Sequence, residues 1–200
     1  LLVARCPTVV AAYVRAANGD EPIAPRADLS LAANFLYMLT GRDPDSVVSR
    51  ALDMYWVTVI DHGMSASTFT ARVIASTRSD MVSAITGAIG AMKGPLHGGA
   101  PGPVLRMLME IGTADRAEDW VRRELAAGRR IMGFGHRVYH TEDPRATHLR
   151  RMSKEACERS GQPKWYEMSA RIEEIVKTEK KLNANVDFYS ASTYYVSGMP

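Results

Sequence analysis

Several features that define other protein classes are scarce in this chain of 200 residues. Its two cysteines, Cys6 and Cys157, form no Cys-x-x-Cys motif and no zinc-type spacing with histidine, so a disulfide framework is not indicated. Lysine and arginine form no long run, and a net charge of +3 gives no reason to expect a nucleic-acid-binding arm. No stretch approaches the roughly 18 uninterrupted apolar residues of a membrane span. These absences predict a reduced, cytoplasmic protein that binds neither nucleic acid nor membrane.

The composition and the first residues of the chain indicate a globular protein of which this chain is one part. Hydrophobic residues make up 46% and charged residues 24%, which is typical of a globular protein of one or two domains. The chain has neither a starting methionine nor a signal peptide, and Leu1-Leu2-Val3 opens within a helical pattern. We therefore expect a larger fold that is incomplete at both ends.

Apolar residues recur at three- and four-residue spacing along nearly the whole chain, as in helices with one buried face. Ser30 and Asp43-Pro44-Asp45 are typical helix starts, and Gly41 and Gly128 typical helix ends. The alternation typical of strands is nearly absent, and only Arg130 to Met132 suggests a short extended segment. The sequence predicts an all-α, multi-helical fold whose loops carry the chemistry. The expected helices cover residues 2–17, 30–39, 43–59, 65–77, 80–92, 101–112, 113–127, 143–159, 163–182 and 189–196.

The helix expected at 80–92 is lined with small residues, which are Ser83, Ala84, Gly87, Ala88, Gly90 and Ala91. A glycine inside a helix costs up to about 1 kcal/mol relative to alanine, so close packing against another backbone is a reasonable compensation. That backbone belongs either to the core of this chain or to a second subunit.

Four short stretches place ionisable side chains beside glycine, proline or a helix start, where the backbone can approach a ligand closely. The first is Asp61-His62, ahead of Ser65-Ala66-Ser67-Thr68-Phe69. The second and third are the glycine-rich segments around His97 and His136, and the fourth is Asn185-Val186-Asp187-Phe188. The segment Asp143-Pro144-Arg145 follows the third stretch.

The histidine turns each allow two interpretations. Near the helix expected from Pro101, a neutral His97 could donate a hydrogen bond to a developing oxyanion, but a structural turn histidine is favoured from the turn alone. Around His136, Gly133 and Gly135 would form a nest of backbone N–H groups that, with Arg137, suits a nucleotide-type anion. A metal site formed by His136 and His140 is disfavoured, because the glycines make a helical turn doubtful and no HExxH motif is present.

The remaining candidates have structural alternatives that residue type alone favours. Asp187 would by default cap the helix expected from Tyr189, although Val186 and Phe188 could surround it with the apolar environment that a general base needs. Arg145 would be a solvated charge at a helix start, and His62 a structural loop histidine.

The four stretches and the Asp-Pro-Arg segment resemble the citrate synthase family, in the order of that family and over essentially the whole chain. The resemblance implies a citrate synthase-like fold with residues 1–103 in a large helical domain and 104–200 in a small CoA-binding domain. It also implies a homodimer in which the region of 80–92 packs against its symmetry mate.

The resemblance further implies a role for each residue. Asp187 would remove a methyl proton from acetyl-CoA while neutral His97 stabilises the enol form. His136 would polarise oxaloacetate, and His62 and Arg145 would hold it. The residues implied in CoA binding are Met132, Gly133, Phe134, Gly135 and Arg137.

The implied reaction is the condensation of acetyl-CoA with oxaloacetate and water to give citrate and CoA. The CoA thioester is a substrate, and no metal or tightly bound cofactor is implied. A 2-methylcitrate synthase that uses propionyl-CoA, or an enzyme that cleaves citryl-CoA, would share every motif. A non-catalytic helical interaction module is the alternative from another class, and it would tolerate alanine at His97 and Asp187.

Overall fold

The computed structural model describes residues 2–61, 63–94, 97–98, 101–136, 139 and 141–199. Within them the chain is helical, no strand is formed, and one isolated β-bridge pairs Phe134 with Ala184. The helices are α1 (Leu2–Ala17), α2 (Leu31–Thr40), α3 (Ser46–Val59), α4 (Ala66–Ser76), α5 (Met81–Met92), α6 (Pro101–Ile111), the 3-10 helix η1 (Ala114–Arg116), α7 (Ala117–Ala126), α8 (Pro144–Arg159), α9 (Lys164–Lys180) and α10 (Val186–Val196). The all-α prediction is confirmed.

Two local predictions were wrong. Arg130 to Met132 form loop and turn, and the single bridge lies further on, at Phe134. The last helix begins at Val186 and not at Tyr189, because the extended backbone of Asn185 and its side chain provide the cap. Asp187 therefore lies inside the first turn of α10.

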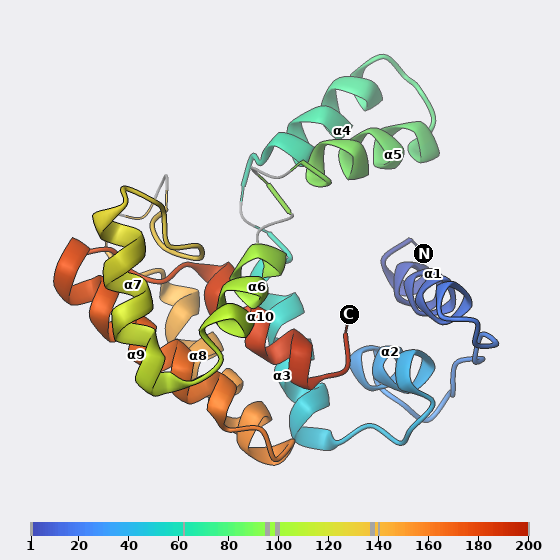
Figure 1. The fold of residues 1–200 in the computed structure, drawn as a ribbon. Coiled ribbons are helices and arrows are strands. Elements are labelled where there is room, and N and C mark those ends of the chain that lie inside the picture. Colours follow the sequence, from blue (N-terminus) through green and yellow to red (C-terminus); the bar gives the residue numbers. More distant parts are fainter. Residues whose placement is uncertain are drawn as a thin grey trace.

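Two main cores organise the helices (Figure 1). Buried side chains of α6 to α10 form the larger core, with Leu108, Ile172 and Phe188 fully buried in it. Helices α1, α2 and α3 form the second core around Leu36 and Leu52. Helix α3 also packs against α8 and α10, so it connects the two cores.

Side chains cap the helices that lead into the expected site. Ser65 accepts a hydrogen bond from the backbone N–H of Thr68 at 3.2 Å and begins α4. Asp143 accepts from the N–H of Arg145 at 2.9 Å and begins α8, whose first residue is Pro144. Such caps satisfy backbone donors that a helix start leaves unpaired, so they fix where each helix begins.

Helices α4 and α5 pack chiefly on each other and project from the rest of the chain as a hairpin (Figure 1). At Gly87 an added Cβ would lie 2.4 Å from Cδ1 of Ile74, so Gly87 faces α4 and a side chain there would have to displace Ile74. At Gly90 an added Cβ would meet nothing within 4 Å. The small residues of α5 therefore serve packing within the hairpin at one position, whereas Gly90 faces open space.

Among the described helices, none combines the length and the apolar character that a membrane span requires.

Candidate active site

Asp187 lies half-buried in the first turn of α10, where its N–H donates to the Asn185 side-chain oxygen at 3.0 Å. Burial raises the pKa of this carboxyl. The charges of Arg145 and His97 oppose that effect, and the charge of Asp143 adds to it, leaving the pKa above its ordinary value. Asn185, and not Asp187, caps the helix, so the carboxylate of Asp187 is not used for capping.

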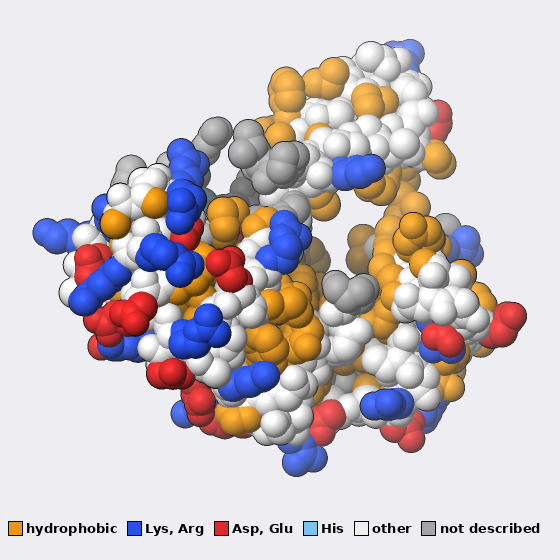
Figure 2. Space-filling view, viewed as in Figure 1, with side chains coloured by type: hydrophobic (Ala, Val, Ile, Leu, Met, Phe, Trp, Pro, Cys, Tyr) orange, Lys and Arg blue, Asp and Glu red, His pale blue; other side chains and the backbone are white. Residues whose placement is uncertain are grey.

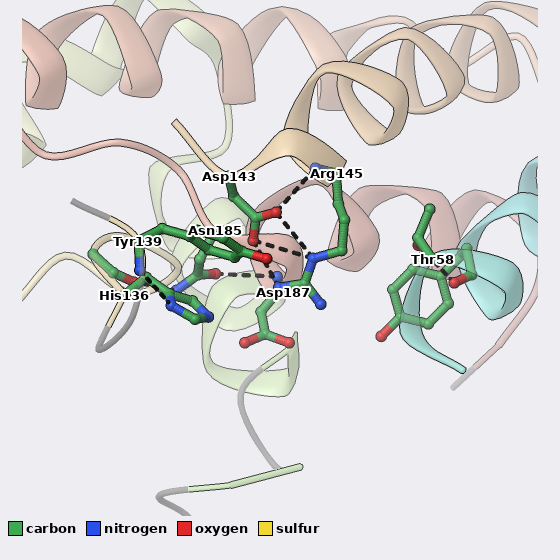
Figure 3. A network of polar contacts seen from close by, with 9 residues as sticks. Thr58, His136, Tyr139, Asp143, Arg145, Asn185 and Asp187 are labelled. Atoms are coloured by element: carbon green, nitrogen blue, oxygen red, sulfur yellow. Dashed lines mark hydrogen bonds and ion pairs between the residues drawn. The ribbon is translucent and has the colours of Figure 1, made fainter. Parts of the chain in front are cut away.

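Arg145 is held by Asp143 in a two-point ion pair (Figure 3). Its Nε donates to Oδ1 at 2.9 Å and its Nη2 to Oδ2 at 2.7 Å, and Asp143 is only 2% exposed. Burial alone would raise the pKa of Asp143, but the hydrogen bonds from Arg145 outweigh it and the pKa lies below its ordinary value. The pair therefore stays ionised, with the guanidinium fixed in place.

The ion pair also determines which part of Arg145 can meet a ligand. A guanidinium carries five N–H donors, and Asp143 takes those on the Nε–Nη2 edge. The Nη1–Nη2 end keeps donors in the planar arrangement that matches a carboxylate. A substrate carboxylate could thus bind Arg145 without displacing Asp143.

His97 lies in the turn that follows α5, where its N–H donates to the carbonyl of Gly94 at 3.0 Å. Its ring Nε2 is 2.9 Å from the hydroxyl oxygen of Ser67, in the first turn of α4. Ser67 is a site residue that the sequence did not predict; its only signal was a place in the polar stretch after His62. The neighbouring Gly98 is required by space, since an added Cβ would lie 2.6 Å from Cγ of Met92.

His136 lies on the other side of Asp187 from Arg145 in the close-up (Figure 3). Its Nδ1 accepts from the backbone N–H of Tyr139 at 3.2 Å, and the two rings lie 4.7 Å apart. The charge of His136 also helps to lower the pKa of Asp143, which places the imidazole near the ion pair.

The loop 133–135 is hydrogen-bonded to the segment that leads into α10. Gly135 N–H donates to the carbonyl of Asn183 at 3.0 Å, and Asn185 N–H donates to the carbonyl of Gly133 at 2.9 Å. Gly133 has φ +86°, and an added Cβ would lie 2.7 Å from the ring of Phe188. Only glycine fits there, so the loop and the helix carrying Asp187 are fixed to each other.

A small pocket opens beside this loop and contains two predicted residues, Gly135 and His136. The other lining residues are Tyr139, Thr141, Lys181, Leu182 and Asn183. Lys181, which the sequence analysis missed, supplies a cation that suits an anionic ligand; its weak signal was Lys180-Lys181 near the end of an expected helix. Of the other predicted CoA-binding residues, Phe134 packs 4.5 Å from Phe188 and Met132 lies partly buried against the larger core.

His62, Arg137 and the alternative metal ligand His140 lie outside the described residues. Within the described part of the chain, no group of three or more His, Cys, Asp or Glu side chains could hold a metal ion. A second, open hollow between α2 and α3 includes none of the predicted site residues.

The arrangement as a whole brings together groups from four distant segments. Asp187 experiences the charges of both Arg145 and His97, and His136 acts on Asp143 beside Arg145. A carboxyl of raised pKa, an imidazole and a fixed guanidinium are the groups required to remove a proton next to a carbonyl and to stabilise the anion formed.

All 200 residues match the protein family described as "Citrate synthase, C-terminal domain". The chain belongs to the citrate synthase family. It is 52% identical over 198 residues to Citrate synthase 2 of Bacillus subtilis, covering 99% of this chain and 53% of that relative. It is 50% identical over 200 residues to the citrate synthase of Haloferax volcanii and 41% identical over 204 residues to 2-methylcitrate synthase 1 of Corynebacterium glutamicum, covering 100% of this chain each time and 53% and 54% of those relatives.

Solved citrate synthases have the same fold. The enzyme from Pyrobaculum aerophilum superposes with a TM-score of 0.89 at 43% identity, covering 97% of this chain and 49% of that one. The enzyme from Thermoplasma acidophilum, in a ternary complex with carboxymethyl coenzyme A and oxaloacetate, superposes with a TM-score of 0.89 at 32% identity, covering 99% of this chain and 55% of that one. This chain thus spans about half the length of the citrate synthases it matches.

Proposed function

We propose that the whole protein condenses acetyl-CoA with oxaloacetate and water to give citrate and CoA. The convergence of Asp187, His97 and Arg145 carries this proposal. His97 and Arg145 come from separate segments of the chain, and the charges of both lower the pKa of the Asp187 carboxyl. Family membership supports the reaction class, and the Thermoplasma acidophilum relative forms a ternary complex with carboxymethyl coenzyme A and oxaloacetate. A CoA thioester is then a substrate, and the proposal includes no metal or tightly bound cofactor.

Proton removal is the first step. Asp187 takes a proton from the methyl group of the thioester, and burial prepares it for this because a desolvated carboxylate holds a proton more strongly. His97 faces the thioester oxygen and donates a hydrogen bond to it as the enol forms. That bond stabilises charge that develops only during the reaction.

Carbon–carbon bond formation follows. The enol carbon attacks the keto carbon of oxaloacetate, whose oxygen His136 polarises. Arg145 binds a carboxylate of oxaloacetate through the Nη1–Nη2 end of its guanidinium, and His62 is proposed as a second contact. Water then hydrolyses the thioester of the condensed product, which releases CoA and citrate.

A 2-methylcitrate synthase using propionyl-CoA is the second candidate, because a relative at 41% identity has that name. One methyl group in an apolar pocket changes binding by only about 1–3 kcal/mol, so both substrates need to be measured. The whole protein should release CoA from acetyl-CoA only when oxaloacetate is present. Greater kcat/KM with propionyl-CoA would favour the second candidate, and no CoA release with either thioester would favour an interaction module.

We also propose a homodimer formed through the α4–α5 hairpin. Exposed hydrophobic side chains lie along it (Figure 2): Phe69, Val73, Met81, Val82, Ile89 and Met92 are 48% to 71% exposed. Light scattering should give a dimer, and Ile89→Asp should produce monomers. A monomeric wild-type protein would overturn this assignment.

We propose that residues 1–103 belong to a large domain and that residues 104–200 form a small CoA-binding domain. We also propose that the protein is cytoplasmic. Helices α6 to α10 share one core, which supports a separate small unit. Because α3 packs on α8 and α10, closure of the small domain would have to change that contact. Structures with and without oxaloacetate that superpose as one rigid body would contradict closure.

A further inference from the structure

An arginine outside the groups described above joins three segments. In α8, Arg150 donates from Nε and Nη2 to the two carboxylate oxygens of Glu173 in α9, at 2.9 Å and 2.6 Å. Its Nη2 also donates to Glu142 at 2.5 Å. The hydroxyl of Tyr189, in α10, donates to Glu173, and the Arg150 guanidinium lies 5.6 Å from the centre of the Tyr189 ring.

The network runs from a half-exposed edge into the core, since the side chains of Arg150 and Glu142 are 27% and 38% exposed. Tyr189 is 0% exposed and Glu173 is 9% exposed. The cost of desolvating buried charges often offsets their attraction, so such a network is weak evidence for a purely stabilising role. Its members do restrict geometry, because the planar guanidinium and the carboxylate of Glu173 meet at two points.

Both ends of the network lie beside groups of the candidate site. Glu142 directly precedes Asp143, the residue that holds Arg145. Tyr189 follows Asp187 by two residues in the same helix turn. Arg150 and Glu173 therefore connect the backbone that supports the ion pair to the backbone that supports the carboxyl of raised pKa.

We propose that Arg150, Glu173 and Tyr189 are positioning residues that set the Asp187 carboxylate relative to the Asp143–Arg145 pair. The inference rests on the proposed function, since it assigns Asp187 the role of base. Proton removal requires the reacting atoms in near-attack geometry, and a displacement of about 1 Å can reduce the rate by roughly 100-fold. A small rotation of the first turn of α10 would produce such a displacement while the fold is kept.

The first test compares two tyrosines of α10 in the whole protein. Tyr189→Phe removes one hydroxyl and keeps the ring; we expect kcat to fall roughly 10-fold, with both KM values changed less than about threefold. Tyr195→Phe is the matched control, because its ring packs 4.8 Å from Trp165 in the C-terminal part of the helix. It should leave kcat unchanged.

A second pair tests the carboxylate. Glu173→Gln should lower kcat in the same way, whereas Glu174→Gln, whose side chain is 66% exposed and pairs with Arg171, should not. In an Asp187→Ala background, Tyr189→Phe should cause no further loss of the residual rate, because there is no base left to position. The inference would be overturned if the losses of rate from Asp187→Ala and Tyr189→Phe multiplied in the double variant. It would also be overturned if Tyr189→Phe or Glu173→Gln lowered the thermal midpoint and left kcat unchanged.

One readout does not need turnover. The carboxyl carbon signal of ¹³C-labelled Asp187, assigned by its loss in Asp187→Asn, should shift in Tyr189→Phe and stay unchanged in Tyr195→Phe. No shift in Tyr189→Phe would refute the positioning role even in an inactive protein. Absence of condensation by the wild type would instead refute the proposed function alone.

Discussion

The ring Nε2 of His97 lies 2.9 Å from the hydroxyl oxygen of Ser67, which is 30 residues earlier in the chain. Ser67 is 5% exposed and His97 is half-buried, so the contact is partly shielded from water. When His97 is neutral and Nε2 accepts the Ser67 proton, the ring carries its own proton on Nδ1. The Ser67 hydroxyl can donate or accept, so the contact orients the ring, and with Ser67 as the donor Nδ1 can donate to a substrate oxygen.

Replacing Ser67 should loosen the orientation of the His97 ring. We expect Ser67→Ala to lower kcat about 10-fold with little change in either KM, and His97→Ala to lower it roughly 100- to 1,000-fold, as for a lost oxyanion donor. Ser76→Ala, at the exposed end of α4, is the control and should be neutral. Steady-state kinetics of the whole protein measures all three. Equal kcat for Ser67→Ala and Ser76→Ala would remove Ser67 from the mechanism.

Asp187→Asn should abolish proton removal while oxaloacetate still binds. The amide keeps the size of the side chain but cannot take the methyl proton, so kcat should fall by roughly 100- to 10,000-fold. Calorimetric titration should give an oxaloacetate affinity close to that of the wild type. Asp119→Asn, at an exposed position in the first turn of α7, is the control. Near-normal kcat in Asp187→Asn would exclude Asp187 as the base.

The pH profile should reflect the raised pKa of Asp187. The base acts only when ionised, so kcat/KM should fall as the pH drops through that pKa, at a pH above the ordinary carboxyl value of 3.8. The charge of Arg145 lowers the pKa of Asp187, so Arg145→Gln should move the acid limb of the kcat/KM profile to higher pH. It should also lower the maximal kcat/KM. The position of the limb, compared between the two proteins, is the measurement. A limb that moves to lower pH would contradict the electrostatic coupling.

Gly133 and Gly128 offer a matched pair for the loop beside α10. Both have positive φ, +86° and +71°, but only at Gly133 would an added Cβ meet a neighbour, the ring of Phe188 at 2.7 Å. We expect Gly133→Ala to lower the free energy of unfolding by roughly 2–5 kcal/mol, from strain plus overpacking. Gly128→Ala should lower it by about 1 kcal/mol from strain alone. Urea unfolding measures both, and equal losses would show that the Phe188 contact is unimportant.

The sequence predicted most helices because the signals that start and stop them act within a few residues. Ser30 and Asp45 cap α2 and α3 through N–H groups two or three residues away, and Gly41 ends α2 with φ 71°. Asn185 and Asp187 are both residue types that can cap a helix, so residue type alone could not decide which of them caps α10. The extended backbone of Asn185 makes it the cap, and hydrogen bonds with the loop 133–135 hold that segment in place.

By itself, the sequence determined the helical class of this protein and the motif positions of His97, His136, Arg145 and Asp187. Only the tertiary structure decided that Ser67 meets His97, that Asp143 fixes Arg145, and that Gly87 packs inward while Gly90 faces outward. The physical reason is range. Apolar spacing and capping are local, whereas the raised pKa of Asp187 depends on burial and on charges that helix packing brings from distant parts of the chain.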